Sequence, residues 1–118
     1  MELSPVEKAL KTVKIDTEKI AEGFYNIIPD DAKSCMRLGM LPAKFMELLE
    51  NTMKEKLSKI ITPLKKFNQE TFGGWAEDAL KTENEFIDKW EKETRREAIR
   101  KISSELIHIA TIKGLCIL

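Results

Sequence analysis

Residues 67–76, FNQETFGGWA, decide the fold that this sequence predicts. Gly73 and Gly74 directly follow a long run of helical periodicity, and helical periodicity resumes near Trp75. Glycine adopts backbone angles at a helix end that other residues avoid, so two glycines favour a helix stop and a tight turn. The sequence therefore predicts two long antiparallel helices that are joined at this turn.

The helix before the turn is expected to begin at Pro42, because proline is favoured in the first turn of a helix. Its apolar face is broad, with side chains three or four residues apart: Phe45, Leu49, Met53, Leu57, Ile60 and Ile61. Pro63 removes a backbone donor, which predicts a kink over residues 59–62. Leu64 and Phe67 continue the spacing beyond the proline, so a kink is expected and not a stop.

The helix after the turn is predicted to run from near Trp75 to about Lys113. Its core-facing side has helical spacing: Ala76, Leu80, Ile87, Trp90, Thr94, Ala98, Ile102, Leu106 and Ile109. The stretch 91–97 is almost wholly charged, which leaves a break into two helices open. Three acid–base pairs four residues apart favour a continuous helix: Asp88–Lys92, Glu91–Arg95 and Glu97–Lys101.

An unbroken helix of about 39 residues would be ~58 Å long at the usual rise per residue. Part of such a helix would lack cover from the rest of a small chain. A break, or a second subunit, would supply that cover, and we expect the protein to be oligomeric. The expected subunit interface is Trp90, Thr94, Ala98 and Ile102.

The N-terminal region predicts a third long helix. Residues 4–7, Ser-Pro-Val-Glu, provide a serine cap, a proline in the first turn and a glutamate suited to a capping box. Apolar or small side chains then follow at alternating spacings of four and three: Val6, Leu10, Val13, Thr17, Ile20, Phe24 and Ile27. Pro29 is expected to end this helix near Ile28.

A short helix over residues 32–38 completes the predicted set, capped by Asp30 or Asp31 and ended by Gly39. The expected fold class is therefore all-α, a helical bundle of three long helices plus one short helix. At 118 residues, the chain is expected to form a single domain, residues 1–118.

The net charge of zero, with 20 basic and 20 acidic residues, weighs against a dedicated nucleic-acid binder, which usually has a clear positive excess. The charge is unevenly distributed. Residues 44–66 have a net charge of +3 and residues 70–93 a net charge of −5. Either neighbouring helices neutralise each other, or the surface is dipolar and recognises a partner or a second subunit.

Five lysines within the first of these segments define what we call the Lys-rich face: Lys54, Lys56, Lys59, Lys65 and Lys66. It is either a solvated helix face or a patch that contacts nucleic acid or lipid headgroups. No aromatic residue lies within the run, which disfavours binding of single strands by stacking.

No apolar stretch approaches the ~20 residues that span a bilayer. Cys35 and Cys116 are the only cysteines, and no secretory signal pattern precedes them, so free thiols and a cytoplasmic location are expected. The apolar tail, residues 114–118, is expected to dock on the bundle or on a partner.

Two carboxylate couples are the strongest chemical signal. Glu47-x-x-Glu50 and Glu85-x-x-Asp88 are the only two places where an acid follows a glutamate at a spacing of three. That spacing puts both acids of a couple on one face of a helix. Four carboxylates that converge between two helices can hold Mg²⁺ against a phosphate group. Two ordinary polar boundaries between helices would give the same pattern.

The couples resemble the Glu-x-x-Glu and Glu-x-x-Asp motifs of the all-α nucleotide pyrophosphohydrolases, the MazG-type superfamily. In that family four acids bind Mg²⁺, which holds a nucleoside triphosphate while water splits it to monophosphate and pyrophosphate. The resemblance covers residues 47–88 and implies that Glu47, Glu50, Glu85 and Asp88 are metal ligands. It also implies a nucleotide substrate and a small all-helical fold.

Three lysines lie one turn from these acids and are candidates to contact phosphate oxygens: Lys54, Lys89 and Lys92. Solvated ion pairs are their alternative role. His108, the only histidine, follows Glu105 by three residues, but a di-iron bundle needs two such Glu-x-x-His motifs. A histidine that borders the core is the simpler interpretation. No nucleophile can be assigned from the sequence, so the catalytic residues stay unknown.

The leading hypothesis is therefore a Mg²⁺-dependent nucleoside triphosphate pyrophosphohydrolase, or a relative of one. The alternative is a non-catalytic helical interaction module, or a small subunit of a cytoplasmic assembly, that acts through the Lys-rich face and the apolar tail.

Overall fold

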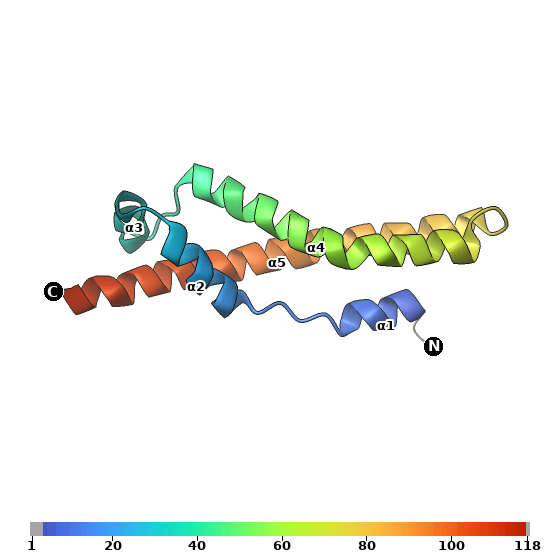
Figure 1. The fold of residues 1–118 in the computed structure, drawn as a ribbon, viewed down its shortest axis with the longest axis horizontal. Coiled ribbons are helices and arrows are strands. Elements are labelled where there is room, and N and C mark those ends of the chain that lie inside the picture. Colours follow the sequence, from blue (N-terminus) through green and yellow to red (C-terminus); the bar gives the residue numbers. More distant parts are fainter. Residues whose placement is uncertain (1–3, 118) are drawn as a thin grey trace. The chain divides into compact units, whose positions relative to one another are not determined.

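The structure, a computed structural model of the chain, is all-helical over the residues that it describes (Figure 1). These are residues 4–117, without the side chains of Arg37 and of residues 114–117. The prediction that the apolar tail docks therefore lies outside the described side chains. The five helices are α1 (Pro5–Lys11), α2 (Thr17–Ile27), α3 (Asp30–Arg37), α4 (Ala43–Phe72) and α5 (Glu77–Ile117). The predicted all-α class is confirmed.

The helices pack into two compact units, and each unit contains two separate stretches of chain. Unit 1 is formed by Met1–Lys14 and Lys54–Arg96, and unit 2 by Ile15–Met53 and Glu97–Leu118. The two longest helices, α4 and α5, contribute residues to both units.

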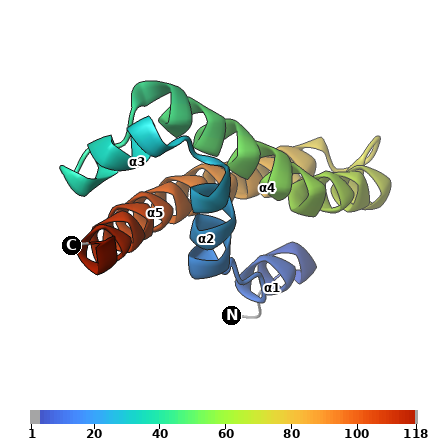
Figure 2. The same cartoon turned by 60° about the vertical axis from the view of Figure 1, so that its left-hand side comes forward.

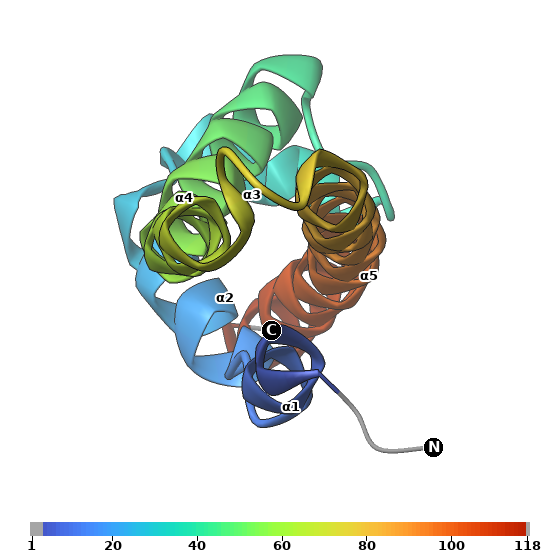
Figure 3. The same cartoon turned by 90° about the vertical axis from the view of Figure 1, so that its right-hand side faces the viewer.

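Unit 1 is the α4–α5 hairpin with α1 packed along it. Figure 3 looks at this hairpin from its turn, and α1 lies against both long helices. Val6 and Leu10 of α1 are buried against Ile87 of α5. Four half-buried side chains complete this cluster: Ile60, Ile61, Leu64 and Trp90. Burial of these apolar side chains is the main favourable term that holds α1 on the hairpin.

The glycine turn forms as predicted. Gly74 has a φ of +85°, which strongly favours glycine. A Cβ atom at Gly73 would lie 2.4 Å from the carbonyl oxygen of Gln69, so this position also requires glycine. The amide of Gly74 donates to Oε1 of Glu77 at 2.9 Å, which ties the turn to the first residue of α5.

Unit 2 is built from α2, α3, the start of α4 and the end of α5. Figure 2 shows α2 crossing α5, and both helices contribute to one apolar core. Its largest fully buried members include Met36, Leu49, Met53, Ile102 and Leu106. Pro29 follows the end of α2, and Gly39 with a φ of +84° follows α3, as the sequence predicts.

The N-terminal region differs from its prediction, because the expected single helix is two helices. α1 ends at Lys11 and α2 begins at Thr17. Asp16 caps α2, and its Oδ1 accepts from the amide of Lys19 at 3.1 Å. The break falls at the boundary between the units, since α1 belongs to unit 1 and α2 to unit 2. The predicted start at Ser4 is confirmed, since its Oγ accepts from the amide of Glu7 at 3.2 Å.

Both long helices run without interruption. α4 continues through Pro63, and α5 continues through the charged stretch 91–97. Two of the expected ion pairs form, Glu91–Arg95 at 3.0 Å and Glu97–Lys101 at 3.7 Å. Asp88 instead pairs with Lys65 of α4 at 2.6 Å.

Candidate functional site

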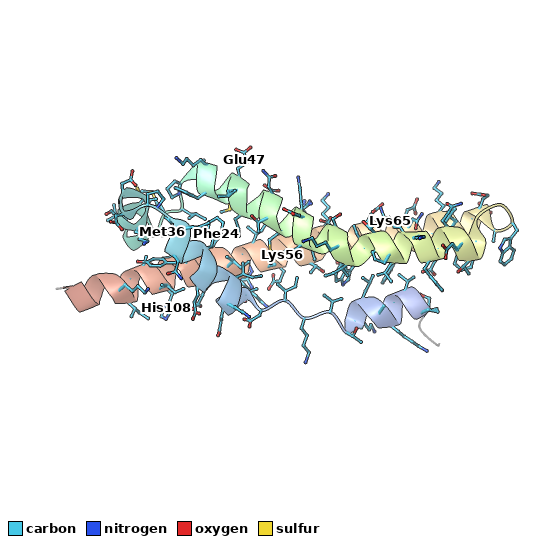
Figure 4. All side chains as sticks on the ribbon, viewed as in Figure 1. Phe24, Met36, Glu47, Lys56, Lys65 and His108 are labelled. Atoms are coloured by element: carbon cyan, nitrogen blue, oxygen red, sulfur yellow. The ribbon has the colours of Figure 1, made fainter. Side chains whose placement is uncertain are left out.

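The two carboxylate couples lie in different units. Glu47 and Glu50 are on the first turns of α4 in unit 2, and Glu85 and Asp88 are on α5 in unit 1. All four side chains are exposed, and Figure 4 shows Glu47 projecting outward from α4. The two acids of each couple lie one turn apart on a helix, as the spacing predicts. Their full exposure was not predicted, because Glu50 and Asp88 were expected to lie within or at the edge of an apolar face.

The contacts of each unit show which helical segment each couple borders. In unit 2, Met46, the residue before Glu47, has its Sδ 3.9 Å from Oγ of Ser103. In unit 1, Oδ1 of Asp88 accepts from Nζ of Lys65. The segment around Ser103 does not contain Glu85 or Asp88, and the segment around Lys65 does not contain Glu47 or Glu50. The contacts within each unit therefore do not bring the four carboxylates together. No cluster of three or more His, Cys, Asp or Glu side chains suited to a metal ion occurs among the described residues.

The three lysines assigned to phosphate contacts are all exposed members of unit 1. Lys89 and Lys92 follow Asp88 on α5, while Lys54 lies on α4. They share a unit with Glu85 and Asp88 but not with Glu47 and Glu50. The proposed role on phosphate therefore has support only from their closeness in sequence to the acids.

The residues expected at a subunit interface have cover from this chain itself. Ala98 and Ile102 are buried in the core of unit 2, with exposed fractions of 4% and 0%. Trp90 is half-buried against the Val6–Leu10–Ile87 cluster of unit 1, and Thr94 is half-buried. Ala98 and Ile102 are therefore core residues of unit 2, while Trp90 and Thr94 keep part of their surface exposed. The assignment of the four residues to a subunit interface stays a prediction.

The Lys-rich face is largely free of internal partners. Lys65 is the member that forms an ion pair, with Asp88. The other four lysines are exposed, and none of them forms an ion pair with a described residue. Among these, Lys56, Lys59 and Lys66 are spaced by three and seven residues, so they share one side of α4. Figure 4 labels Lys56 and Lys65 on this helix.

The hairpin has a different chemical character on its two edges. Lys65 and Asp88 pair across one edge. Phe67 and Phe86 occupy the same level of the hairpin, and helical geometry places them on the opposite edge. Their exposed fractions are 42% and 38%. Unit 1 therefore offers exposed apolar surface as well as free positive charge.

Unit 2 contains a cavity of about 390 Å³ between α2 and α5. The lining side chains come from one face of each helix: Glu22, Tyr25, Asn26, Glu105, His108, Ile109, Ile112 and Lys113. A volume of this size is within the range of small-molecule sites. His108 is labelled on α5 in Figure 4.

Tyr25 is the buried member of this lining, with an exposed fraction of 5%. The ammonium groups of Lys33 and Lys113 lie 4.5 and 4.7 Å from the centroid of its ring. Two cations over one ring are held by the negative electrostatic potential of the ring face. No hydrogen bond among the described residues uses the phenol hydroxyl, so that group remains available at the cavity.

His108 and Glu105 are recognisable in the sequence from their spacing, whereas Glu22 and Asn26 were not predicted as site residues. The spacing Glu22-x-x-Tyr25-Asn26 places these three side chains on one face of α2, and that was the only signal in the sequence. Its meaning depends on the crossing of α2 and α5, which the spacing alone does not reveal.

Comparison of the chain with protein-family models, curated proteins and solved structures gave no match. Among the described residues, no helix has both the length and the apolar character needed to cross a membrane.

Proposed function

We propose that this protein is a non-catalytic helical interaction module whose Lys-rich face binds an acidic protein surface. The observation that carries the proposal is that the charges of Lys56, Lys59 and Lys66 are unpaired. They are exposed on one side of α4 and have no ion-pair partner among the described residues. Like charges held on one helix face repel each other, and an acidic partner relieves that repulsion.

A protein partner is favoured over nucleic acid by the charge balance of the whole chain. Basic and acidic residues are equal in number, so the long-range field that drives nucleic-acid binding is weak. The exposed rings of Phe67 and Phe86 add apolar surface to the same unit, and aromatic side chains are enriched at protein interfaces.

The test is capture of partners from cells of the natural host with the wild-type chain and two charge-reversed variants. The first variant combines Lys56→Glu, Lys59→Glu and Lys66→Glu. The control combines Lys8→Glu, Lys19→Glu and Lys81→Glu, which change the charge equally at exposed sites outside the Lys-rich face. We expect the control variant to capture the same partner proteins as the wild type and the first variant to lose them. Added salt should release these partners from the wild-type chain, because salt screens interactions between exposed charges. Retention of the same partners by the first variant would contradict the proposal.

We further propose that the module is a cytoplasmic homo-oligomer. The unpaired Cys35 supports a reducing compartment, and the exposed Phe67 and Phe86 support self-association. Light scattering at high protein concentration tests the second point. A mass near that of one chain, 13.6 kDa, would rule out the oligomer.

A second candidate is the Mg²⁺-dependent nucleoside triphosphate pyrophosphohydrolase. The observation in its favour is that all four acids keep their spacing on helices and are exposed to solvent. In this role Glu47, Glu50, Glu85 and Asp88 hold the metal, while Lys54, Lys89 and Lys92 contact the phosphates. Metal ligation by carboxylates is favourable for Mg²⁺, and the ion neutralises phosphate charge.

Pyrophosphate release from a panel of nucleoside triphosphates with Mg²⁺ distinguishes the two candidates. The enzyme would be established if the wild type releases pyrophosphate, Glu50→Gln does not, and Glu55→Gln still does. Glu55 is the control because it belongs to neither couple. Absence of release, together with no Mg²⁺ or Mn²⁺ binding in calorimetry, would eliminate it.

A further inference from the structure

The outward side of α4 in unit 1 carries a symmetric row of side chains, which we call the palindromic seam. Its members are spaced by three, four, four and three residues: Lys56, Lys59, Pro63, Phe67 and Glu70. Spacings of three and four place them on one side of the helix. All five are exposed, and the three charged members form no ion pair with a described residue. The seam is therefore open surface whose spacing is the same in both directions from Pro63.

The residues at mirrored positions of the seam are chemically complementary. Lys56 and Glu70 each lie seven residues from Pro63 and carry opposite charges. Lys59 and Phe67 each lie four residues from it, and an ammonium group is attracted to the face of an aromatic ring. Neither pair can meet within one helix, because even Lys59 and Phe67 are ~12 Å apart along the axis. The complementarity can act only between two such helices that run in opposite directions.

We propose that a second copy of the chain packs on the palindromic seam, with the two α4 helices antiparallel and Pro63 on the two-fold axis. In a symmetric interface of this kind, each contact between two different residues occurs twice. The dimer therefore contains two Lys56–Glu70 pairs and two Lys59–Phe67 contacts. A partner of unrelated sequence has no need of this symmetry. The inference rests on the proposed function, because it names the acidic surface that the Lys-rich face binds.

Exposed aromatic surface at the seam adds an apolar contribution to the pairing. Phe67 is 42% exposed, and Phe86 on the same edge of the hairpin is 38% exposed. Pairing about Pro63 places each Phe67 against the partner's Lys59, whose alkyl stem covers part of the ring. The net charge of zero also means that no overall repulsion opposes the approach of two copies. Because the ion pairs lie at the surface, added salt should weaken the dimer.

Charge reversal tests the pairing, with the mass in solution measured by light scattering at low salt. The wild type should have twice the mass of one chain, which is 13.6 kDa. Lys56→Glu and Glu70→Lys should each raise the dissociation constant of the dimer at least about tenfold, because each replaces two attractive pairs by two repulsive ones. An equal mixture of the two variants should regain the dimer, because both pairs of the mixed dimer again have opposite charges. Lys81→Glu is the control, since Lys81 is exposed on α5 and lies outside the seam.

Cross-linking tests the position of the two-fold axis. Cys35 and Cys116 are the only cysteines, so Cys35→Ser with Cys116→Ser gives a background without thiols. Pro63→Cys in this background should form a disulfide-linked dimer when dissolved oxygen and copper phenanthroline oxidise the two thiols, because a residue on the axis faces its own copy. Thr62→Cys is the matched control. Thr62 is also exposed but lies about 100° around the helix, so it should cross-link at least about tenfold more slowly.

Three results would overturn the inference. They are a wild type that stays monomeric at high concentration, a mixture of the two charge variants that does not regain the dimer, and equal cross-linking at positions 62 and 63. Circular dichroism of each variant confirms that the helices are retained. The proposed function is tested separately by partner capture. If the wild type is monomeric and its Lys-rich face still captures another acidic protein, this inference fails and the proposed function stands.

Discussion

Asn68 of α4 donates a hydrogen bond from Nδ2 to Oδ1 of Asn84 of α5, at 3.1 Å, inside unit 1. Asn68 is fully buried, and its own Oδ1 has no partner. Such a polar pair in a seam of apolar contacts fixes the register of two helices, because a slip leaves the amide of Asn68 buried and unpaired. The pair therefore favours one alignment of the hairpin at some cost in stability.

Asn68→Leu should raise the free energy of unfolding by about 1 kcal/mol, because it removes an unsatisfied buried carbonyl group. Asn84 is half-buried, so its released amide can bond to water. Chemical denaturation measures the change. Asn84→Leu is the matched variant and should lower stability by about 1–3 kcal/mol, because it leaves the whole Asn68 amide unpaired. A loss of stability in Asn68→Leu would show that an unseen partner satisfies this oxygen.

Two glycines provide a matched pair of alanine substitutions with opposite signs. Gly73→Ala should destabilise, because its Cβ would lie 2.4 Å from the carbonyl oxygen of Gln69. Gly23→Ala in α2 should stabilise by about 0.5–1 kcal/mol, since nothing lies within 4 Å of its Cβ and alanine is the better helix former. Thermal unfolding of both variants checks the signs. Equal effects at the two sites would refute the steric argument at the turn.

Ile102→Ala tests whether this residue belongs to the core of the chain or to a subunit interface. Ile102 is fully buried in unit 2, so its truncation should cost about 2–5 kcal/mol. The mass in solution should stay the same. Ile27→Ala is the control, because Ile27 is 68% exposed, and it should change stability by less than about 0.5 kcal/mol. A change of mass with little loss of stability would restore Ile102 to an interface.

Glu97 should give a small contribution to stability that depends on pH. A hydrogen bond from Arg100 is the main cause that lowers the pKa of this exposed carboxyl group below its usual value of 4.5. A lowered pKa in the folded state stabilises above the unfolded pKa, and this stabilisation is lost as pH falls through the folded value. Glu97→Gln should therefore melt slightly lower than the wild type at pH 7 and equally at strongly acidic pH. Glu93→Gln, at an exposed residue without a described ion pair, controls for loss of one charge.

Several helix ends and the glycine turn were predictable because they depend on local chemistry. Ser4, Pro29 and the two glycines of the turn act through their own backbone or cap, so their roles follow from sequence alone. The break before α2 was missed, although Asp16 is a good cap. The seam from Val6 to Ile27 has the same spacing whether it forms one helix or two, and only packing in separate units distinguishes the two cases.

The candidate sites show the same limit. The spacing of Glu47 with Glu50, and of Glu85 with Asp88, correctly places each couple on one side of a helix. The segment that each couple borders depends on helix register, which individual side chains such as Asn68 control. Likewise the cavity beside His108 depends on the crossing of two helices that are distant in sequence, and no local pattern encodes that crossing.

The division of unit 2 into two distant stretches of chain has a consequence for folding. Its residues up to Met53 meet those after Arg96 only when the intervening segment, Lys54–Arg96, closes on itself. For a flexible segment of this length, loop closure opposes folding by about 3 kcal/mol. The α4–α5 hairpin needs only contacts near its own turn, so it can form early. Once the hairpin has formed, the two stretches of unit 2 are already close, and most of the entropic cost of loop closure no longer opposes the folding of unit 2. Mutations at the turn should therefore slow the folding of unit 2, although the turn lies in unit 1.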